Sequence, residues 1–176
     1  RVWNALIARN NNAVPTEDIW RSYGKTFDSI SVCFSKGLGA PVGSVLIGGQ
    51  SFIEEAHRTR KVLGGGMRQI GGLAGACLHA LDHELPRMNQ DHFHAQELAK
   101  TLENIECVDS IEPVDTNIVI FSVKAHVSAD QFVAWADKQG IACFPFGGQK
   151  VRFVTHRDVT EDQIKRACTL LKQAQF

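Results

Sequence analysis

Lys36 is the residue whose surroundings first suggest chemistry. It follows the apolar segment 30–34 and precedes a turn that contains Gly37, Gly39 and Pro41. A lysine at a strand end usually extends its amine to water, and that is one interpretation. The other is an amine nucleophile, because burial lowers the pKa of a lysine and the neutral amine can form a Schiff base. The neighbouring glycines would let a planar cofactor approach the backbone.

Arg152 is a second candidate because it interrupts the apolar segment 151–154. Side chains alternate along a strand, so Arg152 is expected to face away from Val151 and Phe153. Such an arginine is either an edge residue or a guanidinium directed into a cleft. In a cleft it would bind a carboxylate through two parallel hydrogen bonds. The residues alone leave both interpretations open.

The basic segment 58–68 is a third candidate, with Lys61 and Arg68 on either side of the glycines 64–66. It is either a solvated helix face followed by a flexible break, or a loop that binds phosphate at the start of the next helix. In the second case Lys61 or Arg68 would be the charged partner. The glycine spacing fits neither the Walker nor the Rossmann pattern, which argues against nucleotide binding.

The histidines and cysteines predict no metal site and no disulfide framework. His79 and His83 share a helix face and could bind a metal, but the zincin glutamate is missing between them, which favours a surface or interface pair. Five cysteines are scattered without a CxxC pair. An odd number of unpaired cysteines favours reduced thiols and a cytoplasmic protein.

Charge and hydropathy exclude two classes of partner. The 176 residues carry 19 basic and 19 acidic side chains, so the formal net charge is zero. A neutral chain gives no indication of a nucleic-acid partner. No apolar run is long enough to span a membrane, so we expect no membrane partner. The length allows one domain or parts of two.

The apolar pattern predicts the elements that position the candidate residues. The glycine turn after Lys36 predicts that strands 27–35 and 43–48 are antiparallel neighbours. The order strand, helix, strand, strand, helix in the last third is typical of a small α+β sandwich. The other expected strands are 117–123, 141–144 and 150–155. The expected helices are 1–8, a short one after Thr16, one from Ser51, a long region 67–104 that Pro86 kinks or restarts, 128–139 and 160–173.

Three segments together are more specific than any single residue: SVCFSKGLGAPVGSVLIG, RKVLGGGMRQIGG and VRFVTHRDVT. With them, the sequence resembles the low-specificity L-threonine aldolase family over essentially its whole length. The resemblance implies an α/β fold, namely the C-terminal part of a fold-type I transferase that depends on pyridoxal 5'-phosphate. Residues 1–105 would be the end of the large cofactor-binding domain with an interdomain helix, and residues 106–176 a small α+β domain.

The resemblance also implies roles for the candidate residues. Lys36 matches the family lysine that holds pyridoxal 5'-phosphate as an internal aldimine. Arg152, and Arg1 at the end of the family's Asp-Gly-Ala-Arg motif, match arginines that bind the carboxylate of the amino-acid substrate. Lys61 and Arg68 match basic residues that approach the cofactor from a neighbouring subunit, which implies a homo-oligomer, a dimer of dimers.

Some of the family's residues would precede Arg1, among them the aspartate that pairs with the pyridinium nitrogen and the histidine that stacks on the cofactor ring. We therefore expect a C-terminal half that needs the missing N-terminal half for activity.

The resemblance implies cleavage of L-threonine or L-allo-threonine to glycine and acetaldehyde. Two alternatives stay open. One is another fold-type I enzyme, such as a β-eliminating lyase, which would use the same lysine and arginine but form pyruvate and ammonia. The other is a non-catalytic half that only contributes Lys61 and Arg68 to a partner subunit.

Overall fold

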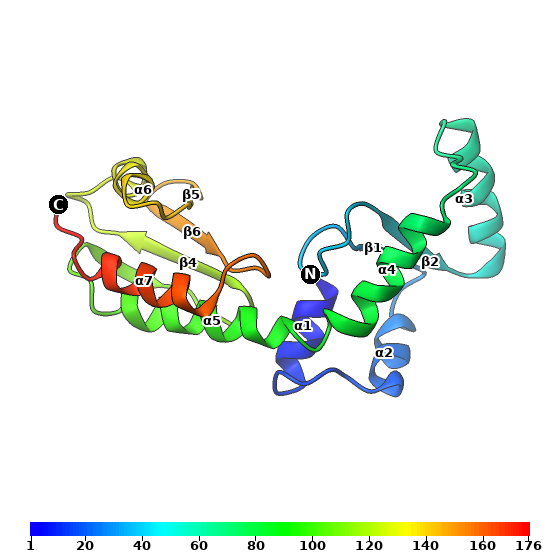
Figure 1. Ribbon diagram of the computed structural model, residues 1–176, viewed down its shortest axis with the longest axis horizontal. Helices are drawn as coiled ribbons and strands as arrows, with labels where there is room; N and C mark the ends of the chain where they lie inside the picture. Colours follow the sequence, from blue (N-terminus) through cyan, green and yellow to red (C-terminus); the bar gives the residue numbers. More distant parts are fainter. The chain divides into compact units, whose positions relative to one another are not determined.

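The chain forms seven helices and six strands in a computed structural model that describes residues 1–176, and glycine or proline lies in most of the connections between them (Figure 1). Contacts divide the chain into two units, 1–87 and 88–176, each described by itself below. The helix over 88–102 belongs to the second unit, since it packs on the C-terminal sheet. The expected boundary after residue 105 stays a prediction about the domains of the complete protein. None of the helices is both long and apolar enough to cross a lipid bilayer.

The N-terminal unit is built around one antiparallel strand pair. Its strands pair from Ser29 opposite Gly48 to Cys33 opposite Ser44, which confirms the expected pairing. The expected helical region restarts after Pro86, which is one of the two outcomes expected at that residue, and it begins at Gly71 instead of Met67. The elements of this unit are α1 (Val2–Arg9), α2 (Glu17–Gly24), β1 (Ser29–Cys33), β2 (Ser44–Gly48), α3 (Gln50–Val62) and α4 (Gly71–His83).

Strand β2 leaves its apolar side chains exposed. Val45, Leu46 and Ile47 are 43%, 43% and 50% accessible, although consecutive residues of a strand face opposite sides. At the end of α3, Val62 and Leu63 are about four-fifths accessible. Exposed apolar surface of this kind is typical of a face that binds another protein, a ligand or a membrane.

The C-terminal unit is the expected α+β sandwich with one additional strand. Its sheet has the order β3-β4-β6-β5, and all its neighbours are antiparallel. The unpredicted strand β3 has only two apolar residues, Val108 and Ile111, and an irregular register. The elements are α5 (Met88–Leu102), β3 (Val108–Ile111), β4 (Ile118–Val123), α6 (Ala129–Lys138), β5 (Phe144–Pro145), β6 (Lys150–Val154) and α7 (Glu161–Leu171).

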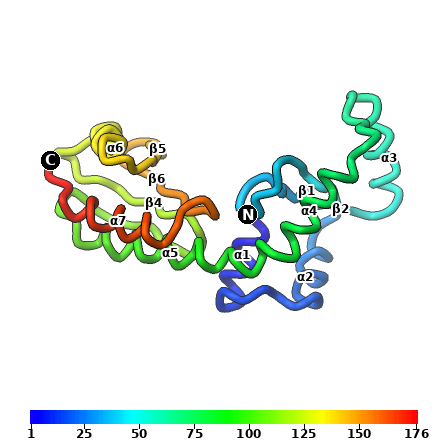
Figure 2. The backbone as a smooth tube through the Cα atoms, viewed as in Figure 1, coloured from blue at the N-terminus to red at the C-terminus, as the bar shows by residue number.

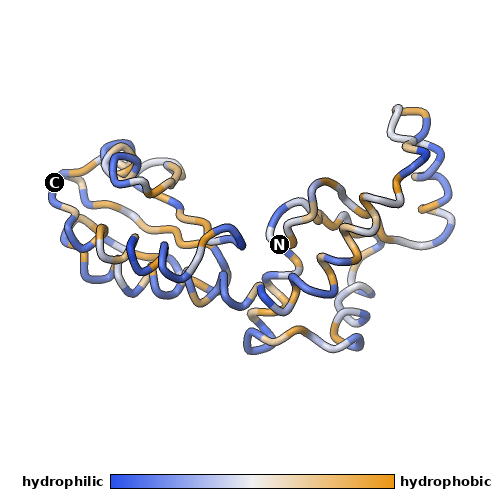
Figure 3. The backbone as a smooth tube through the Cα atoms, viewed as in Figure 1, coloured by the Kyte–Doolittle hydropathy of each residue, from blue (hydrophilic) through white to orange (hydrophobic).

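The core of the C-terminal unit lies on one face of this sheet. Helices α5 and α7 run side by side and, with α6, supply buried side chains to the same cluster as β4 and β6 (Figure 2). The Phe132 ring of α6 lies 5.1 Å from the Phe121 ring and 6.5 Å from the Phe153 ring. Figure 3 shows that β4 and β6 carry mostly apolar residues, which is the hydrophobic pattern that these contacts require.

The cysteines have two kinds of environment. Burial raises the pKa of the Cys143 thiol to about 11 and also raises the pKa of Cys107. Hydrogen bonds with Ser35 and Ser44, and more weakly the charge of Lys36, hold the pKa of the Cys33 thiol below its usual value. All five cysteines are free.

Replacing Phe132 by Ala is expected to destabilise the C-terminal unit strongly. The side chain is fully buried against four other aromatic rings, and such a truncation costs about 3–5 kcal/mol. Urea unfolding followed by circular dichroism measures the change. Phe93→Ala in α5 is the matched control, since that ring is half exposed and its loss should cost well under half as much. Equal losses for the two variants would contradict this account of the core.

Alkylation with iodoacetamide near neutral pH is expected to reach Cys33 first and Cys107 and Cys143 last. The thiolate is the nucleophile, so a lowered pKa raises the reactive fraction and a raised pKa reduces it. Peptide mass spectrometry over time gives the order, and labelling in urea is the control, in which the rates should converge. Labelling of Cys143 as fast as Cys33 in the folded protein would rule out this order.

Candidate active site

Lys36 lies in a closed turn between β1 and β2. The Phe34 N–H donates to the Gly43 carbonyl at 3.0 Å, and the Gly39 N–H donates to the Lys36 carbonyl at 2.8 Å. Gly39 has a φ of 66°, a conformation that glycine adopts without strain. The side chains of Phe34 and Leu38 are buried in the N-terminal unit and hold the turn in place. The backbone around Lys36 is therefore fixed while its side chain is exposed.

The Lys36 amine has no acidic partner. It makes no hydrogen bond or ion pair in the N-terminal unit, whereas Lys150 and Lys165 of the other unit each pair with a glutamate. Lys36 is exposed in this unit, so the burial expected for an amine nucleophile is not present here, and the unpaired amine is accessible to a ligand.

The structure brings Arg1 into the neighbourhood of Lys36. Arg1 is the N-cap of α1. Two residues later in the chain, the Trp3 ring lies 6.4 Å from the ring of Phe34, which precedes Lys36 by two residues. The charge of Lys36 acts at the backbone nitrogen of Arg1, so the two residues lie near each other. These two residues of the N-terminal unit therefore share one positively charged region, which suits an anion.

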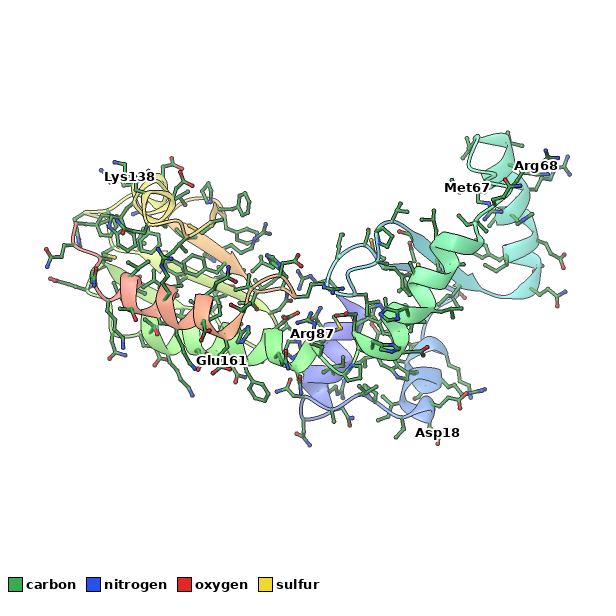
Figure 4. The ribbon with its side chains drawn as sticks, in the orientation of Figure 1. Asp18, Met67, Arg68, Arg87, Lys138 and Glu161 are labelled. Atoms are coloured by element: carbon green, nitrogen blue, oxygen red, sulfur yellow. The ribbon has the colours of Figure 1, made fainter.

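Lys61 and Arg68 lie at the turn that joins α3 to α4. The turn is closed by the Gly65 N–H, which donates to the Arg60 carbonyl at 2.8 Å. Both side chains are exposed, and Figure 4 shows Arg68 extending from this turn. No hydrogen bond, ion pair or shared cavity joins either residue to Lys36 within the N-terminal unit. Their expected action on a neighbouring subunit's site stays a prediction.

Arg152 lies on the face of the C-terminal sheet that is opposite to the core. Val151 and Phe153 are 0% and 3% accessible, so the expected alternation is confirmed. Arg152 is paired across the sheet with Ile120 on one side and Phe144 on the other. Its Nε is shielded from solvent and has no hydrogen-bond partner. A buried unsatisfied donor costs about 1–3 kcal/mol, which an anionic acceptor would recover.

Sequence reasoning missed Phe146, whose ring contacts Arg152. The guanidinium carbon lies 5.2 Å from the centre of the Phe146 ring. The sequence signal that could have identified Phe146 is its place directly before the Gly147–Gly148 turn, which leads into β6.

His79 and His83 form a stacked pair on α4. Their ring centres lie 4.1 Å apart, and the ring planes are inclined by 18°. The Nδ1 atom of His83 lies 3.1 Å from the His79 carbonyl oxygen. No third side chain joins them, since no group of three or more histidine, cysteine, aspartate or glutamate residues is placed to hold a metal ion.

Relatives with similar sequences are named as threonine aldolases. The low-specificity L-threonine aldolase 1 of Arabidopsis thaliana is 37% identical over 177 residues, which is 99% of this chain and 48% of the relative. The low specificity L-threonine aldolase of Saccharomyces cerevisiae is 34% identical over 176 residues, 99% of this chain and 42% of the relative. The chain thus spans about half the length of the curated relatives that it matches.

Solved structures confirm the expected fold. A Listeria monocytogenes protein described as an L-allo-threonine aldolase superposes with a TM-score of 0.74 at 20% identity, over 98% of this chain and 50% of that one. The histidinol-phosphate aminotransferase of Clostridium acetobutylicum gives 0.66 at 13% identity, over 88% and 48%. The chain therefore has the α/β fold of the C-terminal part of fold-type I enzymes. The model of the beta-eliminating lyase family matches residues 1–126, so this chain belongs to the beta-eliminating lyase family.

Proposed function

We propose that this chain is the C-terminal half of an aldolase that depends on pyridoxal 5'-phosphate and cleaves L-threonine or L-allo-threonine to glycine and acetaldehyde. The observation that carries the proposal is the similarity, along nearly the whole chain, to relatives named low-specificity L-threonine aldolase. The unpaired cations at Lys36 and Arg152 support it. Because the relatives are about twice as long, the activity is that of the complete protein.

The residues around Lys36 fit the cofactor. An aldehyde needs an accessible amine, and Lys36 is exposed and free of an acidic partner on a turn whose glycines leave its approach open. Lys36 would hold the cofactor through its Nζ atom, and Lys61 and Arg68 of a neighbouring subunit would add positive charge near the cofactor. Once bound, pyridoxal 5'-phosphate supplies an electron sink for cleavage of the bond between Cα and Cβ of the substrate.

Arg152 and Arg1 would bind and orient the substrate carboxylate. The guanidinium of Arg152 presents a shielded Nε donor and its Nη donors, which match the two oxygens of a carboxylate. Holding the carboxylate fixes which bond at Cα is aligned for cleavage, and orientation of this kind lowers the barrier by restricting the reactants.

A β-eliminating lyase is the second candidate, because the matching family model carries that description. The same lysine and arginine would serve both reactions, so the products separate them. Threonine cleavage yields glycine and acetaldehyde, whereas β-elimination from an amino acid yields pyruvate and ammonia. Incubation of the complete protein with L-threonine, L-allo-threonine and L-serine, followed by assays for glycine and pyruvate, tests the assignment. Pyruvate without glycine would replace the aldolase by the lyase.

We also propose that the complete protein works as a homo-oligomer in the cytoplasm. The exposed apolar residues of β2 and α3 support association with further protein, and the five free cysteines suit a reducing compartment.

Lys36→Ala in the complete protein is expected to abolish both threonine cleavage and the visible absorbance of bound cofactor. The reason is that no other amine of the turn can replace Nζ of Lys36. Absorbance spectra of the purified protein and a glycine assay are the measurements. Lys25→Ala, which removes another exposed lysine of the same unit, should change neither. An unchanged absorbance band in Lys36→Ala would exclude this residue as the cofactor's anchor.

Mixing two inactive variants is expected to restore activity if Arg68 acts across a subunit interface. Half of the pairs formed from Lys36→Ala and Arg68→Ala subunits are hybrids with one intact site of two, so about a quarter of the wild-type activity should return. Subunit exchange followed by the glycine assay measures it. The control mixes Lys36→Ala with Arg1→Ala, which share one region of the same chain and should not complement. No recovery in the first mixture would place Arg68 in its own subunit's site or outside any site.

A further inference from the structure

The charged group of Arg152 lies over an aromatic ring. The Phe146 ring lies under the guanidinium carbon at 5.2 Å, and no carboxylate lies within ion-pair distance of this arginine. The neighbouring charge, Lys150, is already paired with Glu112. A guanidinium over an aromatic face is attracted by the ring's negative face, and more strongly where water is excluded.

The hairpin between β5 and β6 fixes the position of this ring. The Phe146 N–H donates to the Lys150 carbonyl at 2.8 Å, and Gly147 and Gly148 have φ angles of 86° and 57°. Both angles lie in the left-handed region that glycine adopts without strain. The Gln149 side chain donates to the Val127 carbonyl at 2.7 Å and ties the turn to the segment before α6. Phe146 is thus held at a defined place beside β6.

We propose that Phe146 is a positioning residue, whose ring holds the Arg152 guanidinium so that Nε and the Nη donors face a substrate carboxylate. The ring lies under the guanidinium carbon, and no protein acceptor occupies the Nε donor. The contact accepts no hydrogen bond, so it restricts the orientation of the guanidinium without occupying a donor. An ion pair with a carboxylate of the protein would occupy those donors instead. This inference rests on the proposed function, in which Arg152 binds the carboxylate.

The test compares a ligand that has the carboxylate with one that lacks it. The complete protein, loaded with pyridoxal 5'-phosphate, is titrated with glycine and with glycinamide, and binding is followed by the cofactor's absorbance. Phe146→Leu removes the aromatic face and keeps an apolar side chain. It is expected to weaken glycine binding about three- to tenfold and to leave glycinamide binding within about twofold. For threonine cleavage, KM should rise more than kcat changes.

Two variants are controls for this effect. Phe144→Leu makes the same change at an exposed ring of the same hairpin, paired with Arg152 across the sheet but without its stacking contact. Phe146→Tyr keeps the aromatic face. Both should bind glycine within about twofold of the wild type. Unchanged glycine binding in Phe146→Leu, or equal weakening of glycine and glycinamide, would overturn the positioning role.

Arg152→Leu separates this inference from the proposed function beneath it. If glycine binding is lost in Arg152→Leu but normal in Phe146→Leu, only the proposed role of Phe146 is refuted. Glycine binding that is normal in Arg152→Leu would remove the carboxylate role of the arginine itself, and the role of Phe146 with it.

Discussion

Strand register is the constraint on which the candidate residues of both units depend. In β6, Val151 and Phe153 lie in the core and Arg152 on the opposite face. A shift of one residue would exchange them and bury the guanidinium among aromatic rings, at a cost that no nearby carboxylate offsets. In the N-terminal unit, the pairing of Cys33 with Ser44 sets where β1 ends and hence where the turn presents Lys36. Apolar neighbours therefore set the positions of the candidate cations Lys36 and Arg152.

The amine of Lys36 and the guanidinium of Arg152 lack hydrogen-bond partners in the protein for different structural reasons. Lys36 is exposed, and its turn is fixed by backbone hydrogen bonds and by buried Phe34 and Leu38. Its availability comes from the lack of an acidic partner. Arg152 has a shielded Nε donor that is unsatisfied until an acceptor arrives. A carboxylate bound there gains a charge-assisted hydrogen bond in surroundings drier than water, which makes the interaction stronger.

The sequence was sufficient for most elements and for the facing of Arg152, because alternation and glycine turns are local signals. Strand β3 was missed because Val108 and Ile111 are its only apolar residues, and its register with β4 is irregular. The extent of α4 was overestimated at its start, since Met67 and Arg68 continue the helical pattern but lie in a turn. The stacking of Phe146 on Arg152 depends on the geometry of the hairpin, which no periodicity encodes.

An amine and a guanidinium do not by themselves select a reaction. Threonine cleavage and β-elimination both need an electron sink at the amine and an anchor for the carboxylate, so the family model and the aldolase relatives are compatible with the same residues. What differs is which bond of the substrate is held in line for cleavage, and that depends on how rigidly the carboxylate is oriented. A guanidinium stacked on Phe146 has fewer orientations than a free one. Under the proposed function, holding the Arg152 guanidinium at Phe146 would limit the orientations of the substrate carboxylate.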